Sequence, residues 1–217
     1  MEKIVLIGAT GFVGSHILDE LVSRNYEVTA IARNFDKIQN KSPLIKKISV
    51  DVNDIEALSN AIKGHDVVIS AFNAGWTNPN LYEDFMKGSK SIEKATEIAG
   101  VKRLIVIGGA GSLFVDGKQI VDGEDFPQKF KAGATAARDY LNEIKNNKTL
   151  DWTYFSPAIE MNPGIKNGRT GKYRINTESP VFDSQGNSRL SVEDLAYAIA
   201  DEIENHKFSR QRFTAGY

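Results

Sequence analysis

The chain has 217 residues, of which 41% are hydrophobic and 25% are charged. These proportions are typical of a folded globular protein and exclude a disordered, collagen-like or coiled-coil chain. Lysine and arginine number 27 against 28 aspartates and glutamates, so the net charge of -1 argues against nucleic acid or an anionic membrane as partner. We expect one domain over residues 1–217 and a small-molecule ligand.

Cysteine is absent, which excludes disulfides, thiolate nucleophiles, iron–sulfur clusters and cysteine-ligated zinc. The three histidines, His16, His65 and His206, lie far apart in the sequence, so no metal site is expected. The first residues lack the basic start and apolar stretch of a secretion signal, and no apolar run approaches the ~20 residues that cross a bilayer. We therefore expect a cytoplasmic protein without a membrane partner.

Short runs rich in valine and isoleucine alternate with stretches of helical spacing, a pattern typical of a parallel sheet covered on both faces. The six predicted strands span residues 3–8, 27–32, 46–51, 66–72, 103–109 and 151–156. The helices predicted between them span residues 11–24, 54–63, 81–99 and 131–147. Right-handed crossovers then give an α/β Rossmann fold, a doubly wound parallel sheet with strand order 3-2-1-4-5-6.

After Ser156 the pattern changes to a stretch rich in glycine, proline and asparagine, PAIEMNPGIKNGRTGKYRI. This composition predicts a small substrate-side cap over residues 157–190 and no second domain. Ser191 then opens a predicted helix, in which Ser191 and Asp194 approximate a capping box. The final RQRFTAGY indicates a short closing strand.

Three glycines form a G-x-x-G-x-x-G motif where the first predicted strand meets the first predicted helix. Gly8 permits a tight turn, Gly11 lets the backbone approach a pyrophosphate, and Gly14 lets the helix pack closely on the strand. The anion would bind free N–H groups at the helix N-terminus, where the macrodipole favours negative charge. The sequence thus predicts a dinucleotide site, with contacts from Gly8, Thr10, Gly11, Phe12, Val13 and Gly14.

Two residues separate the first and second glycines of this motif, whereas the dehydrogenase fingerprint G-x-G-x-x-G has a single residue there. GATGFVG resembles the motif of the short-chain dehydrogenase/reductase superfamily, specifically of its atypical NAD(P)-binding members. The segments ISAFNAG, VIGGAGSL, LDWTYFSPA and RQRFTAGY extend the resemblance over nearly the whole chain. Together they resemble the NADH-flavin reductases that are often labelled NAD-dependent epimerase/dehydratase. This resemblance implies an NAD(P)H-dependent oxidoreductase.

The end of the second predicted strand bears on the choice of cofactor. An NAD-specific site usually places an acidic side chain there, on the ribose hydroxyls, whereas this sequence has Ala32, Arg33 and Asn34. Arg33 can hold a 2′-phosphate through charge-assisted hydrogen bonds. We therefore predict NADP, with NAD as the alternative if Arg33 is only a solvated surface residue.

Two further strand ends are expected to line the cofactor. Asp51 and Val52 match the Asp-hydrophobic pair that contacts the adenine in this superfamily, although Asp51 equally suits a cap for the helix that begins near Asp54. Ala71 and Phe72 end the fourth predicted strand and are expected to line the ribose and nicotinamide channel.

Carbonyl reductases of this superfamily use a tyrosine with a lysine four residues later, which lowers the tyrosine pKa. None of the seven tyrosines here has a lysine at that spacing, and the expected positions hold Phe130 and Ala134. A flavin or quinone ring delocalises the incoming charge, so stacking and proximity suffice for hydride transfer. We predict a small-molecule acceptor of this kind, a flavin or quinone, reduced by a monomer or homodimer.

The residues expected at the acceptor come from four segments, three of which follow predicted strands and one of which begins a predicted helix. Ser112, in the GGAGS turn, is the candidate catalytic residue that hydrogen-bonds the acceptor. Asn73, Trp76, Lys131 and Pro157 are the candidate substrate-binding residues, with the indole of Trp76 stacked on the acceptor ring. The alternatives are that Ser112 is a turn residue, Lys131 is solvated and Trp76 is an anchor on the core.

Two other functions fit parts of the sequence. An NADP(H)-binding redox sensor that signals through a protein partner would tolerate the missing proton donor equally well. A nucleotide-sugar epimerase or dehydratase would need the tyrosine and lysine, and also a larger C-terminal substrate domain than the chain has after Ser156.

Overall fold

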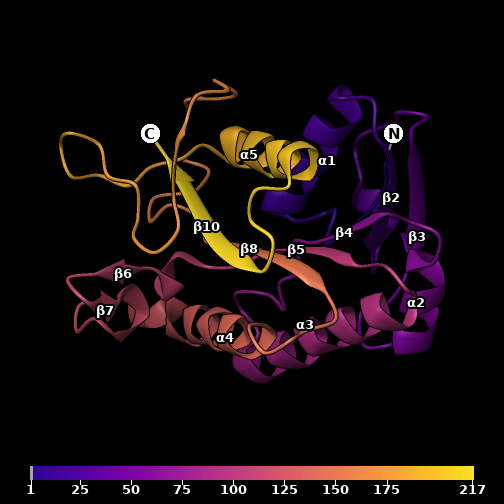
Figure 1. Ribbon diagram of the computed structural model, residues 1–217, viewed down its shortest axis with the longest axis horizontal. Coiled ribbons are helices and arrows are strands. Elements are labelled where there is room, and N and C mark those ends of the chain that lie inside the picture. The colour runs from indigo at the N-terminus through magenta and orange to yellow at the C-terminus, as the bar shows by residue number, and fades with distance from the viewer. Residues whose placement is uncertain (1) are drawn as a thin grey trace.

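The structure, a computed structural model, describes residues 2–217 and is built on a central twisted sheet (Figure 1). The sheet has the strand order β3-β2-β1-β4-β5-β8-β10-β9. Seven of its strands are mutually parallel: β1 (Lys3–Ile7), β2 (Glu27–Ala32), β3 (Ile45–Ser49), β4 (Val67–Ser70), β5 (Arg103–Ile107), β8 (Asp151–Phe155) and β10 (Gln211–Gly216). The predicted order 3-2-1-4-5-6 is confirmed by β3-β2-β1-β4-β5-β8, and the predicted closing strand is β10.

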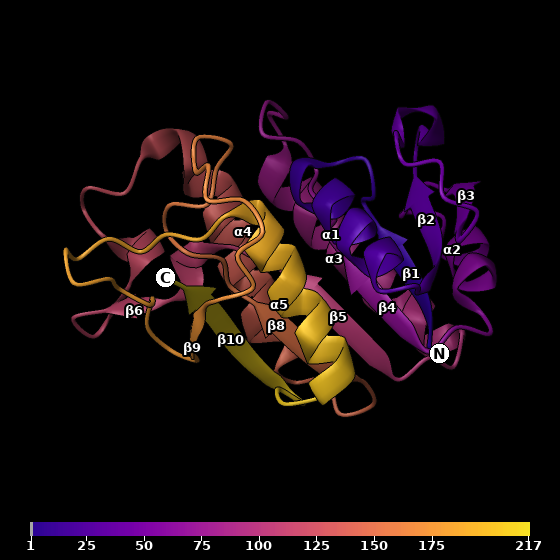
Figure 2. The same cartoon turned by 90° about the horizontal axis from the view of Figure 1, so that it is seen from above.

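Five α-helices cover the two faces of this sheet within the described residues. Helices α1 (Phe12–Ser23) and α5 (Val192–Asn205) lie side by side on one face (Figure 2). The other face carries α2 (Ile55–Ile62), α3 (Leu81–Ile98) and α4 (Gln128–Ile144). The sheet is therefore covered on both faces, as the unbroken apolar runs of its strands predict.

The first strand shows why the core has two halves. In β1, Ile4 and Leu6 are fully buried against the layer of α1 and α5. Val5 and Ile7 alternate with them and are buried against α2, α3 and α4. Successive strand residues point to opposite faces, so a strand with helices on both sides is apolar at nearly every covered position.

Two element boundaries, the end of β4 and the start of α4, differ from the predicted ones. Strand β4 ends at Ser70, two residues before the predicted end, and leaves Ala71 and Phe72 outside it. Helix α4 begins at Gln128, three residues before the predicted start, directly after Pro127 in an extended conformation. Proline has no N–H to lose there, so the helix starts as soon as the chain has passed it.

The segment 157–190 contains one short strand, β9 (Arg174–Asn176), which pairs antiparallel with β10 and was not predicted. A small hairpin, β6 (Phe114–Val115) with β7 (Lys118–Gln119), follows β5 and precedes α4. The predicted capping box of α5 is half formed. The Ser191 hydroxyl accepts from the Asp194 N–H at 3.1 Å, but the Ser191 N–H donates to the Tyr217 hydroxyl at 3.2 Å.

Candidate functional site

The turn between β1 and α1 leaves its N–H groups free of side-chain caps. Gly8 has a φ of +84°, its N–H donates to the Ile31 carbonyl at 3.0 Å, and its carbonyl accepts from Gly11 at 3.0 Å. Gly11 is the N-terminal cap of α1, which has neither a capping side chain nor an acidic residue in its first turn. An uncapped helix N-terminus without nearby carboxylates is suited to a bound anion.

The three glycines have different structural reasons to be glycine. A Cβ on Gly8 would lie 2.5 Å from the Ala71 carbonyl oxygen, and one on Gly14 would lie 2.1 Å from the Gly8 carbonyl oxygen. A Cβ on Gly11 would meet only the Gly8 carbonyl oxygen, at 3.4 Å, which is an ordinary contact. The fold therefore requires glycine at positions 8 and 14, whereas at Gly11 it leaves room that a ligand can use.

A pocket of about 150 Å³ opens beside this turn, at the carboxyl ends of β1, β2 and β4. The strand order reverses between β1 and β4, which is where ligands bind in open parallel sheets. The residues that line the pocket are Ile7, Gly8, Thr10, Gly11, Ile31, Ala32, Arg33, Val50, Val52, Ala71, Phe72 and Asn73.

The pocket brings together most of the residues that the sequence predicts at the cofactor. Phe12, Val13, Gly14 and Asp51 do not line it, because the first three lie within α1 and Asp51 is exposed beyond β3. Sequence reasoning missed the apolar wall formed by Ile7, Ile31, Ala32 and Val50. The sequence could have indicated this wall, because each of these residues lies at the end of a predicted strand, next to residues that we predicted at the cofactor.

Arg33 lies at the rim of the pocket with its side chain exposed. Within residues 2–217 its guanidinium forms no ion pair with a carboxylate, and its carbonyl accepts from the Ser49 hydroxyl at 2.9 Å. The next residue, Asn34, accepts from the Asp36 N–H at 3.0 Å and caps a short 3-10 turn. A cation is thus available beside the pocket, at the end of β2 where an NAD-specific site would present a carboxylate.

The alternative role of Asp51 as a helix cap is wrong. Helix α2 is capped by Asp54, whose carboxylate accepts from the Ala57 N–H at 3.0 Å. The Asp51 carboxylate instead accepts from the backbone and side chain of Asn53, at 2.9 and 3.1 Å. Its remaining oxygen faces no protein donor that the described residues provide.

Ser112 does not reach the pocket. The residue is 0% exposed, and its hydroxyl donates to the Gly109 carbonyl at 3.0 Å and contacts the Ser156 hydroxyl at 2.8 Å. This geometry does not support the expected hydrogen bond to an acceptor and fits the alternative of a turn residue. Pro157, one residue after Ser156, is also buried.

Lys131 is half-buried and does not line the pocket. Its ammonium donates to the Val121 carbonyl and lies 5.6 Å from the centre of the Phe126 ring. The side chain thereby ties the start of α4 to the 3-10 turn Ile120–Asp122. Its position is structural in this conformation.

Trp76 lies on the loop that leaves the pocket wall and packs across α4. Asn73, in the wall, accepts from the Gly75 N–H at 2.7 Å. The Trp76 ring is 59% exposed and meets Phe130 edge to face, with centroids 5.6 Å apart. A Cβ on Gly133 would lie 2.9 Å from the indole, so this glycine makes room for it. Phe130, which sequence reasoning noted only as a missing tyrosine, thus joins Trp76 in an exposed aromatic pair.

Two of the seven tyrosines are almost wholly buried, and their hydroxyls have hydrogen-bond partners inside the protein. The Tyr154 hydroxyl is fully buried and donates to the Ala137 carbonyl at 2.6 Å, and burial raises its pKa. Burial likewise raises the pKa of Tyr140, whose hydroxyl donates to Glu93 at 3.2 Å. Among residues 2–217, no tyrosine lines the pocket.

The model of a family described as NAD(P)H-binding matches residues 8–206. The chain belongs to this family. A solved structure from Bacteroides thetaiotaomicron, described as a "putative epimerase", is 42% identical with a TM-score of 0.91, over 100% of this chain and 97% of that one. A "putative NADH-flavin reductase" from Streptococcus pneumoniae is 33% identical with a TM-score of 0.85, over 100% and 99% of the two chains.

Among curated proteins, the "Uncharacterized protein YwnB" of Bacillus subtilis is 34% identical over 98% of this chain and 97% of its own length. Cinnamoyl-CoA reductase 1 of Arabidopsis thaliana is 26% identical, and the match covers 54% of that longer protein. These similarities agree with the Rossmann fold and with the short-chain dehydrogenase/reductase resemblance. The chain is therefore an NAD(P)H-binding protein with the fold of reductases and epimerases. Within residues 2–217, none of the helices combines the length and apolar character of a membrane span.

Proposed function

We propose that the protein is an NADPH-dependent reductase that passes a hydride to a planar flavin or quinone-like acceptor. The observation that carries this proposal is the combination of a dinucleotide pocket with an aromatic pair where a tyrosine and lysine would stand. Phe130 and Ala134 offer no proton, and Trp76 packs against Phe130. Such a site can stack and orient a ring but has no acid or base for a carbonyl.

The cofactor half follows from the turn and the pocket. The pyrophosphate would lie on the free N–H groups after Gly11, with Phe12 and Val13 contributing through their backbone. The adenine would lie against Val50 and Val52, with the free oxygen of Asp51 as acceptor for its amino group. Arg33 would bind the 2′-phosphate and favour NADPH over NADH.

The acceptor half rests on the loop after β4 and the start of α4. The exposed indole of Trp76 would stack on the acceptor ring, next to Asn73 in the pocket wall, while Phe130 meets the indole edge to face. Bound NADPH would supply the hydride, and the delocalised ring would take its proton from water. Ser112, Lys131 and Pro157 would act indirectly. Ser112 would hold the turn after β5, Lys131 the start of α4, and Pro157 the start of the cap.

The redox-sensor alternative has one observation in its favour, because the same exposed aromatic pair can also contact a partner protein. The epimerase label of the Bacteroides structure belongs to that protein, and the tyrosine and lysine of such chemistry are missing here. A cytoplasmic location stays a prediction of the sequence.

The decisive experiment is oxidation of NADPH and NADH by the purified protein, with FMN, FAD and a simple quinone each added in turn, against a no-enzyme control. We expect oxidation that saturates with the acceptor and is more efficient with NADPH. Trp76→Ala should raise the acceptor KM and leave NADPH affinity unchanged, whereas Ile98→Ala, which alters an equally exposed apolar residue at the far end of α3, should change neither. Tight NADPH binding without acceptor-dependent oxidation would overturn the reductase in favour of the sensor.

A further inference from the structure

Phe72 belongs to the wall of the cofactor pocket, and its backbone is fixed beside the phosphate-binding turn. The N–H of the preceding residue, Ala71, donates to the Ile7 carbonyl at 2.9 Å. A Cβ on Gly8 would lie 2.5 Å from the Ala71 carbonyl oxygen and 3.2 Å from the Phe72 nitrogen, so the turn and this segment are in close contact. The place of the Phe72 ring therefore depends on what its side chain meets.

The Phe72 ring lies on a glycine of α3. A Cβ on Gly88 would lie 2.5 Å from both Cε1 and Cζ of Phe72, and 3.3 Å from a methyl of Val52, which also lines the pocket. The ring is also stacked against Phe85, one turn earlier on the same helix, with centroids 6.0 Å apart and 23° between the ring planes. Only a hydrogen atom fits between α3 and the ring at position 88.

The backbone conformation gives no reason for glycine at this position. Gly88 is buried in the interior of α3, and its φ is not positive. Glycine favours an α-helix less than any residue except proline, so it weakens the helix that carries it. The close approach of Phe72 and Val52 is thus the structural reason for glycine here.

We propose that Gly88 is a positioning residue of the cofactor site, because its missing side chain lets the Phe72 ring lie against α3 and leaves the pocket open for the dinucleotide. This inference rests on the proposed placement of NADPH in the pocket. A methyl at position 88 would push the ring away from α3. Since the Phe72 backbone is fixed beside Gly8, the ring would turn toward the pocket that Phe72 lines.

This geometry places the cost of the added methyl in cofactor binding and not in folding. In the free protein the displaced ring can enter a pocket of about 150 Å³, and alanine favours the helix more than glycine does. In the complex the ring and the dinucleotide would compete for the same space. Overpacking of this kind shifts an equilibrium by about 5- to 150-fold.

The test measures the Kd of NADPH and of NADH for Gly88→Ala by fluorescence titration, together with the Tm of the free protein. We expect both Kd values to rise by about tenfold, at an unchanged or higher Tm. The two cofactors should lose affinity in the same proportion, because the Phe72 wall does not read the 2′-phosphate. This equal loss distinguishes Gly88 from Arg33, whose substitution should weaken mainly NADPH.

A second substitution tests the contact with the ring directly. Leucine lacks the Cε1 and Cζ atoms of Phe72 that the added methyl would meet. In the Phe72→Leu background, Gly88→Ala should therefore change either Kd by less than about twofold. The two substitutions should be non-additive, as expected for side chains in contact.

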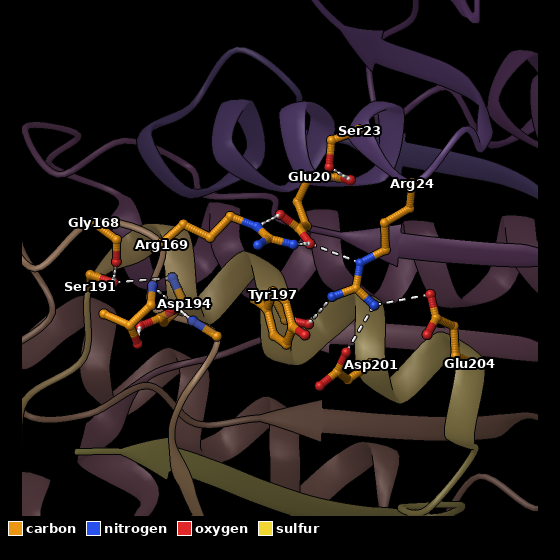
Figure 3. Close-up of polar contacts among 12 residues, drawn as sticks. Glu20, Ser23, Arg24, Gly168, Arg169, Ser191, Asp194, Tyr197, Asp201 and Glu204 are labelled. Carbon is orange, nitrogen blue, oxygen red and sulfur yellow. Dashed lines mark hydrogen bonds and ion pairs between the residues drawn. The ribbon is translucent and has the colours of Figure 1, made fainter.

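Two variants control for a loss of stability away from the pocket. Ala95→Gly removes a buried methyl from α3, two turns beyond Gly88. Arg24→Gln breaks the ion pairs with Asp201 and Glu204, at 2.8 and 3.0 Å, that join the end of α1 to α5 (Figure 3). Neither Ala95 nor Arg24 lines the pocket, so both variants should lower the Tm and leave both Kd values unchanged.

The outcomes separate this inference from the function on which it rests. A Gly88→Ala protein with a lower Tm and unchanged Kd values, or one that does not fold, would overturn the inference, because the cost would then lie in the fold. An equal effect of Gly88→Ala in the wild-type and Phe72→Leu backgrounds would also overturn it. A wild type that binds NADPH but reduces no acceptor would overturn the proposed reductase alone, since the Kd values still report on Gly88. A wild type that binds neither cofactor would overturn both.

Discussion

The different surroundings of Gly11 and Gly14 give the sharpest prediction for the cofactor site. Gly11→Ala adds a methyl whose nearest protein atom is 3.4 Å away, at a backbone conformation, φ −76° and ψ 167°, that alanine readily adopts. Replacing the glycine cap by alanine destabilises the helix, whereas the lower flexibility of the unfolded chain stabilises the fold. The two effects offset one another, so the free energy of unfolding should change by less than about 1 kcal/mol. Under the proposed cofactor placement, the methyl would enter space that the pyrophosphate needs. Losing one charge-assisted hydrogen bond there costs about 1.5–3 kcal/mol, or about 10- to 100-fold in the NADPH Kd.

The assay is NADPH binding by fluorescence titration, with thermal unfolding of the same samples. Gly14→Ala is the contrasting variant, because its methyl would lie 2.1 Å from the Gly8 carbonyl oxygen and the backbone would have to move. Overpacking of this kind costs about 1–3 kcal/mol, so its Tm should drop together with binding. A Gly11→Ala protein that binds NADPH as tightly as the wild type would refute the placement of the pyrophosphate.

Two other outcomes follow from charged residues. Arg33→Ala should weaken NADPH about tenfold and NADH little, because the lost contact is one exposed charge-assisted pair with the 2′-phosphate; equal losses in two binding titrations would exclude it as the selector. Burial raises the pKa of Glu20, but hydrogen bonds from Arg169 and Arg24 outweigh burial and lower the pKa below the unfolded-state value of 4.5. The ionised Glu20 therefore contributes fully to stability above pH 4.5, and this contribution is lost as the pH falls through the lower folded-state pKa. The difference in unfolding free energy between wild type and Glu20→Gln, measured by urea denaturation, should therefore shrink as the pH falls below 4.5, and a constant difference would contradict the ion pairs of Glu20 with Arg24 and Arg169.

Much of the fold could be predicted because local patterns and general rules of chain geometry agree. Strands such as β1, which is apolar at all four positions after the exposed Lys3, are expected to be covered on both faces, and right-handed crossovers then limit the possible strand orders. Strand β9 was missed because all three of its residues are exposed and it exists only through pairing with the edge of β10. Its sequence carries no alternation of apolar and polar residues that would reveal it.

The cofactor side of the site was easier to predict than the acceptor side. Gly14 is dictated by a contact within one strand, turn and helix, and Gly8 has a positive φ in the same turn besides its close approach to Ala71, so their spacing is visible in the sequence. Ser112 and Lys131 have polar side chains close to strand ends that face the expected acceptor site. The Ser112 hydroxyl, however, hydrogen-bonds with Ser156, which is distant in the sequence, and the Lys131 ammonium hydrogen-bonds with the Val121 carbonyl on another turn. Spacing does not reveal such partners.

The sequence by itself determined the sheet order, the phosphate-binding turn and the absence of a tyrosine–lysine pair, because each depends on residues that are neighbours along the chain. The tertiary structure decided where side chains from separate segments meet. It placed Phe130 beside Trp76, directed the Asp194 carboxylate to the backbone of Thr170 and Gly171, and joined Arg169 to Glu20 across most of the chain. These contacts arise from the packing of whole elements, since the partner of a polar group is set by which surfaces come together.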